Sequence, residues 1–362
     1  MNTQGQRFRF STFGESHGEA IGVIIDGVPA GLEIDMEFIQ SELDRRKPGK
    51  SKFETARKES DTAKVLSGTF EDENNVLRST GTSIAMIIYN ENQKSRDYTN
   101  VKDLFRPGHA DFTYFHKYGI RDYRGGGRSS ARETACRVCA GAVAKLILQE
   151  VDIKVVSGIS EIDGIKSEKL DFDYAKSSSI FALDENVEIA QKEAIENALN
   201  SHDSVGGAVV VKALNVPAGL GEPMYYKLDA TIANMMMGLN AVKAVEIGDG
   251  IEASKSKGSQ NNDQITSKGF ETNHSGGILG GISNGDEIIT KIYFKPTPSI
   301  FIEQKTVDTD NNDTNYYLKG RHDPCVAVRG SVVCEAQMAI VLADMLLLNM
   351  SSKIENVKKV YN

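Results

Sequence analysis

Apolar residues recur at helical spacing in several parts of the chain. In the clearest case Met36, Ile39 and Leu43 share one helical face, with Asp35 as the N-cap residue and a Pro-Gly stop signal at 48–49. The same spacing predicts further helices after Ser130 and over residues 186–200, 229–240 and 335–349.

Runs of valine, isoleucine and alternating residues predict strands over 82–89, 207–214 and 288–294. Two polar segments lack any period. We interpret residues 161–179 as a surface excursion and residues 258–272 as a mobile loop. Helices and strands mix without a regular βαβα alternation, and no linker separates two parts. The pattern therefore predicts one mixed domain over residues 1–362.

The chain lacks the glycine fingerprints of two common nucleotide-binding folds. No GxGxxG follows a predicted strand, and no GxxxxGK[ST] occurs. These absences argue against a Rossmann domain and against a P-loop kinase.

The distribution of charge points to a small anionic ligand. The chain has 362 residues and a net charge of −8, which argues against a dedicated nucleic-acid-binding protein. Positive charge is nevertheless concentrated in residues 45–58, where Glu54 is the only acid among many arginines and lysines. An acidic protein with local basic clusters is typical of one that binds an anion in a pocket.

Other features predict a reduced, cytoplasmic protein without a membrane span. Cys136 and Cys139 are one helical turn apart and are expected in the core, and no second CxxC accompanies them, so we expect no metal. The N-terminal residues lack the apolar stretch of a signal peptide. The longest apolar run, 339–348, is too short to cross a bilayer and contains Asp344, which favours a buried helix.

The segment Asp122–Thr134, DYRGGGRSSARET, is the strongest candidate for an anion site. Three glycines allow close approach of the backbone, arginines bracket them, and a helix start follows. Free N–H groups, a favourable dipole and guanidinium groups together bind phosphate oxygens. Ser130 and Glu133 match a capping box. The alternative is a flexible glycine-rich loop with solvated arginines.

Histidines are the candidate acids and bases. His17, His109, His274 and His322 all occur beside glycine, proline or an acid in turn-like contexts, where functional groups are often placed. Taken singly, each could instead be solvent-exposed or bonded locally. The KPTPS segment, Lys295–Ser299, offers a cation, two hydroxyls and a stiffened backbone as a second anion site.

These motifs together resemble the chorismate synthase family. The resemblance extends over nearly the whole chain and rests on long motifs in order: TFGESHG (12–18), RPGHAD (106–111), YRGGGRSSARET (123–134), GLGEP (219–223), VEIGDG (245–250), GGILGGIS (276–283) and RHDPC (321–325).

The resemblance implies a reaction and a fold. The family converts 5-enolpyruvylshikimate 3-phosphate to chorismate and phosphate by a 1,4-anti-elimination, which requires reduced FMN without net redox change. The implied fold is a single α+β domain, a layered sandwich of helices between antiparallel-rich sheets, assembled as a homotetramer. Because no dinucleotide fingerprint remains for an NADPH domain, we expect reduced FMN to come from an external flavin reductase.

The resemblance also implies residue roles. His17 matches the acid that protonates the departing phosphate, His109 the residue that sets the protonation state of the flavin, and Asp323 the carboxylate that assists proton removal from C6. The implied FMN-binding residues are Arg128, Ser129, Ser130, Asn240, Ala241, Gly280, Lys295, Pro296, Thr297, Pro298, Ser299 and Arg321.

A basic pair, Arg46 and Lys52, is implied to bind the substrate or a nucleotide phosphate. Lys52 stands where the family usually has arginine, so the bidentate fork is lost there. Two other functions use the same basic loops: a phosphate-ester enzyme without flavin, and a nucleic-acid-binding protein. Binding of FMN would distinguish the family's enzyme from a phosphate-ester enzyme without flavin. Nucleic-acid affinity that depends strongly on salt would indicate a nucleic-acid-binding protein.

Overall fold

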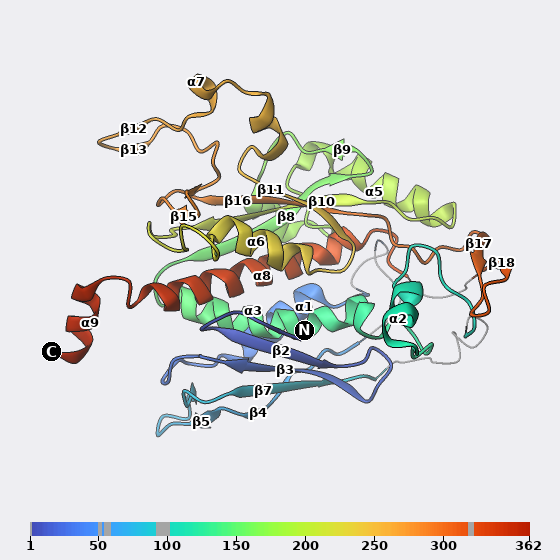
Figure 1. Cartoon of the computed structure of the whole chain (residues 1–362), viewed down its shortest axis with the longest axis horizontal. Helices are drawn as coiled ribbons and strands as arrows, with labels where there is room; N and C mark the ends of the chain where they lie inside the picture. The colour runs from blue at the N-terminus through green and yellow to red at the C-terminus, as the bar shows by residue number, and fades with distance from the viewer. Residues whose placement is uncertain (1, 50–52, 54–58, 92–101, 318–321) are drawn as a thin grey trace.

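Two antiparallel sheets enclose a layer of helices in the computed structural model, which describes residues 2–49, 53, 59–91, 102–317 and 322–362. Figure 1 shows this α+β sandwich, with α3 and α8 lying between the sheets. The first sheet has the order β1-β2-β3-β7-β4 and the second β11-β16-β10-β8-β9. The predicted sandwich of helices between antiparallel sheets is confirmed.

The strands of the first sheet are β1 (Thr3–Gln4), β2 (Arg9–Gly14), β3 (Ala20–Asp26), β7 (Ile84–Tyr89) and β4 (Lys64–Ser67). Those of the second are β11 (Val242–Ile247), β16 (Ile288–Phe294), β10 (Gly207–Leu214), β8 (Lys154–Ile162) and β9 (Ile165–Lys166). Short hairpins pair β5 (Thr69–Glu71) with β6 (Leu77–Ser79), β12 (Ile265–Thr266) with β13 (Gly269–Phe270), β14 (Ile278–Leu279) with β15 (Ile282–Ser283), and β17 (Gln304–Val307) with β18 (Asp313–Tyr316).

The helices are α1 (Met36–Arg46), α2 (Asp111–Tyr118), α3 (Thr134–Gln149), α4 (Phe172–Ser177), α5 (Glu185–Asn200), α6 (Leu228–Met237), α7 (Gly258–Asn261), α8 (Val326–Asn349) and α9 (Ile354–Tyr361). Short 3-10 helices span Gly127–Ser129, Ala131–Glu133 and Gly250–Lys255.

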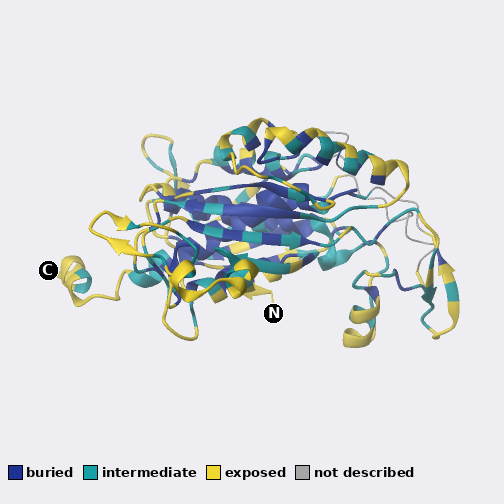
Figure 2. Cartoon of the chain, turned by 90° about the horizontal axis from the view of Figure 1, so that it is seen from above, coloured by how far each residue is buried: buried dark blue, intermediate teal, exposed yellow. Residues whose placement is uncertain are grey.

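The central helices pack closely because small residues line their contact. A Cβ added at Gly141 of α3 would lie 2.4 Å from the Cβ of Ala336 in α8, so the two backbones approach as only glycine permits. The α8 helix is long and apolar enough to cross a membrane, but 83% of its most apolar window is buried inside the protein. It is therefore a core helix, and Figure 2 shows this buried interior between exposed peripheral elements.

Most predicted elements are present, with different ends. The helix after Asp35, the strands over 207–214 and 288–294, and the helix over 186–200 agree with α1, β10, β16 and α5. The ends of two predicted helices differ more: α6 ends at Met237 rather than at residue 240, and α8 begins at Val326 rather than at residue 335.

Two segments predicted as irregular contain regular structure. Residues 161–179 include β9 and α4, whose Ala175 joins a small cluster with Leu183 and Val210 on the outer face of the second sheet. Residues 258–272 form α7 and the β12–β13 hairpin, which project from the body in Figure 1. Both segments are polar because they lie at the surface, but their backbones pair locally.

Candidate active site

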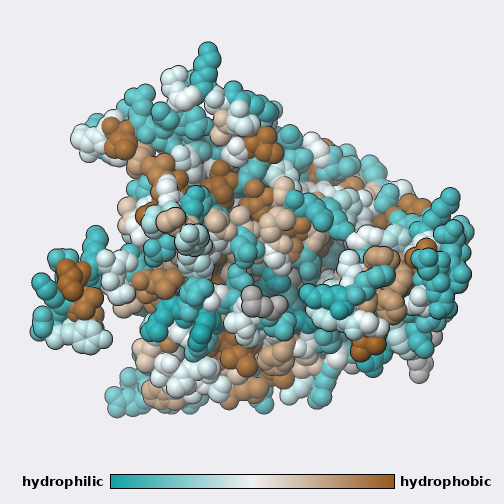
Figure 3. Space-filling model, in the orientation of Figure 1, coloured by the Kyte–Doolittle hydropathy of each residue, from teal (hydrophilic) through white to brown (hydrophobic). Residues whose placement is uncertain are grey.

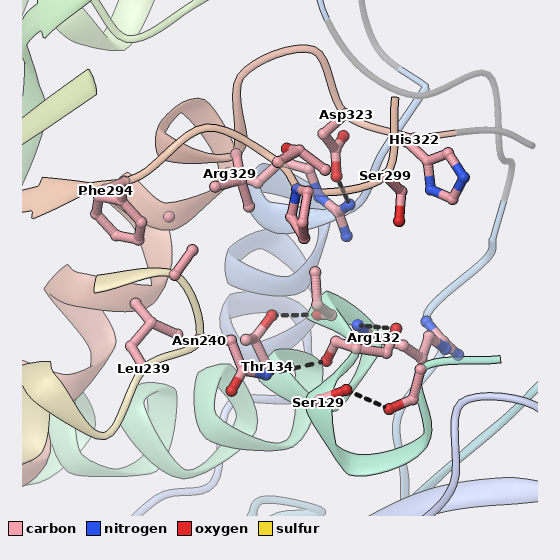
Figure 4. A pocket seen from close by; sticks show the side chains of 18 of the residues that line it. Ser129, Arg132, Thr134, Leu239, Asn240, Phe294, Ser299, His322, Asp323 and Arg329 are labelled. Carbon is pink, nitrogen blue, oxygen red and sulfur yellow. Dashed lines mark hydrogen bonds and ion pairs between the residues drawn. The ribbon is translucent and has the colours of Figure 1, made fainter. Parts of the chain in front are cut away.

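One cavity of about 420 Å³ collects side chains from widely separated segments of the chain. Its volume falls in the range of about 300–1,000 Å³ that is usual for cofactor and substrate pockets. Figure 4 shows the cavity from close by, with Ser129 and Arg132 on one side and Asp323, Arg329 and Ser299 on the other. Its apolar wall comes from Leu239, Ala241, Val242, Phe294, Val326 and Val333.

The glycine-rich loop borders this cavity, but its glycines contact the protein itself. Gly125 has φ +136°, and a Cβ there would lie 2.2 Å from Nδ1 of His17. A Cβ at Gly127 would lie 2.6 Å from Oε2 of Glu15. The loop therefore needs glycine in order to close against the turn between β2 and β3, which carries His17.

The predicted capping box is wrong. Ser130 caps a 3-10 turn, where its hydroxyl accepts from Arg132 N at 3.2 Å. The carboxylate of Glu133 does not return to Ser130, because Thr12 Oγ1 donates to it at 2.9 Å and Arg137 Nε at 3.0 Å. Long-range partners thus replaced the local pairing that the sequence pattern indicated.

His17 and His109 both line the cavity, as predicted for two acid–base groups of one site. Nδ1 of His17 lies 3.0 Å from Oγ of Ser16. Nδ1 of His109 lies 3.2 Å from the carboxylate of Asp111. Burial lowers the pKa of His109 below its usual value, Asp111 opposes that effect, and the cation Arg106 adds to it. His109 is therefore neutral near pH 7.

Asp323 lies on the opposite wall, where Arg329 Nη1 donates to it at 2.7 Å. Figure 4 shows the Asp323 carboxylate and the Arg329 guanidinium joined in this way. The neighbouring His322 also lines the cavity, and burial together with Arg106 lowers its pKa to about 4. This imidazole is therefore uncharged at neutral pH.

The KPTPS segment meets the cavity through Lys295, Thr297, Pro298 and Ser299. Lys295 Nζ donates to the carbonyl of Gly108 at 2.6 Å, next to His109. Burial and the nearby Lys243 lower the pKa of Lys295. A partly buried cation beside another cation is a favourable place for a phosphate, whose negative charge would stabilise both.

Asn240 and Ala241 form a turn that joins the two anion-site candidates. Asn240 Nδ2 donates to the carbonyl of Ser130 at 3.5 Å, and Lys295 N donates to the carbonyl of Ala241 at 3.0 Å. Ala241 has φ +72°, an uncommon conformation for a residue with a side chain. The glycine-rich loop and the KPTPS segment are thus held at opposite edges of one turn.

Arg46 also lines the cavity, yet its guanidinium is fully buried and paired with Asp61. Arg132 pairs with the other oxygen of the same carboxylate. Burial alone would raise the pKa of Asp61, but the two arginines lower it to about 2. This ionised carboxylate fixes two cations in the cavity wall, so their charge is preorganised for an anion.

Three predicted binding residues do not line the cavity. Arg128 Nη2 donates to the Thr12 carbonyl at 3.1 Å, and its Nη1 donates to the Gly14 carbonyl at 3.3 Å, so this side chain holds the loop on β2. Gly280 lies in the turn between β14 and β15, and Pro296 is likewise absent from the lining. Lys52 and Arg321 lie outside the described residues.

Several lining residues were not proposed as site residues from the sequence. Arg106 and Arg132 belong to the recognised motifs and could have been chosen on that signal, whereas Lys243 carries no local signal. His322 was among the candidate acid–base histidines but was given no role. Together the wall holds the cations Arg46, Arg106, Arg132, Arg329, Lys243 and Lys295 against the acids Glu59 and Asp323.

The cavity can therefore bind a multiply charged anion and exchange protons with it through histidine or carboxylate groups. Within the described ranges, no group of three or more His, Cys, Asp or Glu side chains could hold a metal ion. The residues also fit a flavin nucleotide, since apolar walls suit its ring and lysine and serine groups suit its phosphate.

Comparisons with known proteins agree on one family. Residues 8–347 match the chorismate synthase family. The chain is 69% identical to the chorismate synthase of Aliarcobacter butzleri over 361 residues, covering 100% of this chain and 99% of that one. It is 57% identical to that of Helicobacter pylori strain G27, with 100% of each covered.

A crystal structure of chorismate synthase superposes with a TM-score of 0.76 at 33% identity, covering 99% of this chain and 97% of the other. The chain therefore belongs to the chorismate synthase family, lyases of the shikimate pathway that use reduced FMN to eliminate phosphate from 5-enolpyruvylshikimate 3-phosphate and form chorismate.

Proposed function

We propose that the elimination takes place in the cavity described above, with His17, His109 and Asp323 as its proton-handling groups. The observation that carries this proposal is the convergence of all three on one cavity, together with two anion-binding segments. Phosphate leaves C3 with its electron pair and a proton leaves C6, so the site must stabilise one anion and accept one proton.

The proposed roles are those that the family resemblance implies, and the position and charge of the residues support them. His17 donates a proton to the departing phosphate, and the arginines of the wall, Arg46, Arg106 and Arg132, stabilise the negative charge that develops on it. His109, neutral and buried, holds or accepts a proton beside the flavin. Asp323, oriented by Arg329, assists removal of the C6 proton.

The cofactor would be held by the two segments that border the Asn240–Ala241 turn. Lys295, Thr297, Ser299, Ser129 and Ser130 would bind it, and reduced FMN supplies electron density to the substrate when bound. For Arg128 we propose an indirect contribution, through its hold on β2, to the position of Ser129 and Ser130.

Phosphate release in anaerobic buffer tests this function. Purified protein with 5-enolpyruvylshikimate 3-phosphate should release phosphate and form chorismate when chemically reduced FMN is added, and not without flavin. Release that is independent of flavin would instead support a phosphate-ester enzyme of another kind.

We further propose that the reducing power comes from outside the protein. In support, no dinucleotide fingerprint occurs in the sequence. Oxidised FMN with NADPH should therefore give no turnover. Sustained NADPH-driven turnover by purified protein would contradict this and would point to the basic segment around Arg46 and Lys52.

We also propose a cytoplasmic homotetramer in which residues 1–362 form one domain. The outer face of the first sheet supports association, since Phe13, Ile24, Leu66 and Tyr89 are each at least 43% exposed. Figure 3 shows apolar residues over this sheet and on α9. Sheet faces of this kind are normally covered by another layer. Sedimentation velocity should give a mass near four chains, and a monomer would contradict the proposal.

A further inference from the structure

Asp111 is a buried carboxylate that the reaction does not use directly. Only 6% of it is exposed, at the first residue of α2. Arg106 donates to it through N at 3.1 Å, Nε at 2.6 Å and Nη2 at 2.7 Å, and Arg121 lies 3.5 Å away. Burial would raise the pKa of Asp111, but the hydrogen bonds from Arg106 and His109, with the charge of Arg106, hold it far below its usual range.

The first consequence concerns His109. Nδ1 of its ring lies 3.2 Å from Asp111 Oδ1. A carboxylate there accepts a hydrogen bond from Nδ1–H, so the neutral ring carries its hydrogen on Nδ1 and leaves the Nε2 lone pair for a ligand. Among the residues that the structure describes, the charged and titratable groups acting on the ring are Asp111, Arg106, Lys295 and His322, and Asp111 is the one anion of these four.

The second consequence concerns His17, on the other side of the glycine-rich loop. Arg106 Nη2, while bonded to Asp111, also donates to the carbonyl of Gly125 at 3.2 Å. Gly125 in turn lies directly against the His17 ring, where a Cβ would come within 2.2 Å of Nδ1. Gly125 therefore lies between Arg106 and the His17 ring, and a shift of Arg106 is expected to alter the position of that ring.

We propose that Asp111 is a positioning residue that sets both acid–base histidines, His109 directly and His17 through Arg106 and Gly125. One carboxylate thus fixes the tautomer of one histidine and the location of the other. This inference rests on the proposed roles of the two histidines.

The test is Asp111→Asn, which keeps the size of the side chain but removes its charge. In otherwise unchanged protein we expect kcat to fall by about 10²-fold with a change in KM of only a few-fold, the loss that misplaced groups cause. In the His109→Ala and His17→Ala backgrounds the further loss should be about 10-fold smaller, since only one of the two histidines then remains to be positioned.

The outcomes separate a positioning role from a structural one. An equal loss in all three backgrounds would overturn the inference, because it would show that Asp111 only supports folding. A reduced loss in the His109→Ala background alone would overturn the His17 branch and retain the other. Full activity of both histidine variants would overturn the proposed roles and this inference with them.

Two further variants keep the result interpretable. Asp111→Glu retains the charge that Arg106 and Arg121 require and moves the carboxylate by one methylene. This variant should therefore fold and still show the fall in kcat and its reduction in the two histidine backgrounds. Asp344→Asn makes the identical chemical change at another buried carboxylate, remote from the cavity lining, and should leave kcat unchanged.

Discussion

Gly125 illustrates how a single residue connects the loop to the chemistry. A glycine-rich segment near a phosphate site is usually explained by close approach of the ligand, but here the close neighbour is the imidazole of His17. The positive φ of Gly125 and the short distance each exclude a side chain.

We therefore expect Gly125→Ala to lower turnover by about 10–10²-fold, because a displacement of His17 on the ångström scale would misalign the proposed proton donor. Steady-state kinetics with reduced FMN measures the change. Gly164→Ala is the matched control: Gly164 also has a positive φ, of +79°, but no atom lies within 4 Å of its added Cβ. That variant should lose stability only, and an equal loss of turnover in it would contradict the explanation.

The histidines themselves give a second prediction at this scale. Replacing His17 with alanine should lower kcat by about 10²–10⁴-fold, the usual contribution of a general acid. Because His17 does not belong to the proposed flavin-binding segments, FMN affinity, measured by fluorescence titration, should remain. A fully active His17→Ala protein would exclude His17 from the mechanism.

At the scale of elements, α8 fixes the start of the chain as well as the core. Its buried Asp344 accepts hydrogen bonds from the backbone N–H groups of Gln6 at 3.0 Å, Arg7 at 2.6 Å and Phe8 at 2.8 Å. The hydroxyl of Tyr226 donates to the same carboxylate at 2.7 Å. The charged residue that interrupts the apolar run thus ties the segment before β2 to the central helix.

Asp344→Asn should lower the free energy of unfolding by about 1–3 kcal/mol, because an amide cannot accept all of these donors and places its own N–H₂ among them. Thermal and urea unfolding measure the loss. The kcat of the folded variant should equal that of the unchanged protein, and a large fall in kcat would mean that α8 transmits the change to Asp323 and Arg329.

At the scale of the whole molecule, buried ionisable groups predict two pH ranges, or windows, over which the stability of the fold decreases. His322 has a pKa of about 4 in the folded protein, below its usual 6.5, so the unfolded chain binds the extra proton between these values. Stability should therefore decrease as pH falls from about 6.5 to 4. Asp61 and Glu335 each have a pKa of about 2, so a second decrease should follow as pH falls from about 4 to 2.

Melting temperature measured across these pH values tests the prediction. His322→Gln should flatten the upper window and leave the lower one. Asp61→Asn should lower stability near neutral pH, since Arg46 and Arg132 lose their shared counter-charge, and should weaken the lower window. An upper window that persists in His322→Gln would assign it to another group.

The sequence by itself determined much of what is local. Helical spacing with an Asp cap located α1, and valine-rich or alternating runs located β10 and β16, because periodicity reports which face of an element is buried. Long ordered motifs identified the family, and through it the reaction and cofactor, since such motifs rarely recur by chance.

Only the tertiary structure decided which groups meet. Ser130 and Glu133 match a local capping pattern, yet Glu133 accepts a hydrogen bond from Thr12 of the distant strand β2. Arg46 was predicted to bind an anionic ligand together with Lys52, and nothing in the sequence indicated that it pairs with Asp61 and shares that carboxylate with Arg132. Hydrogen bonds and ion pairs between distant segments form only when the chain is folded, and no spacing along the sequence encodes their partners.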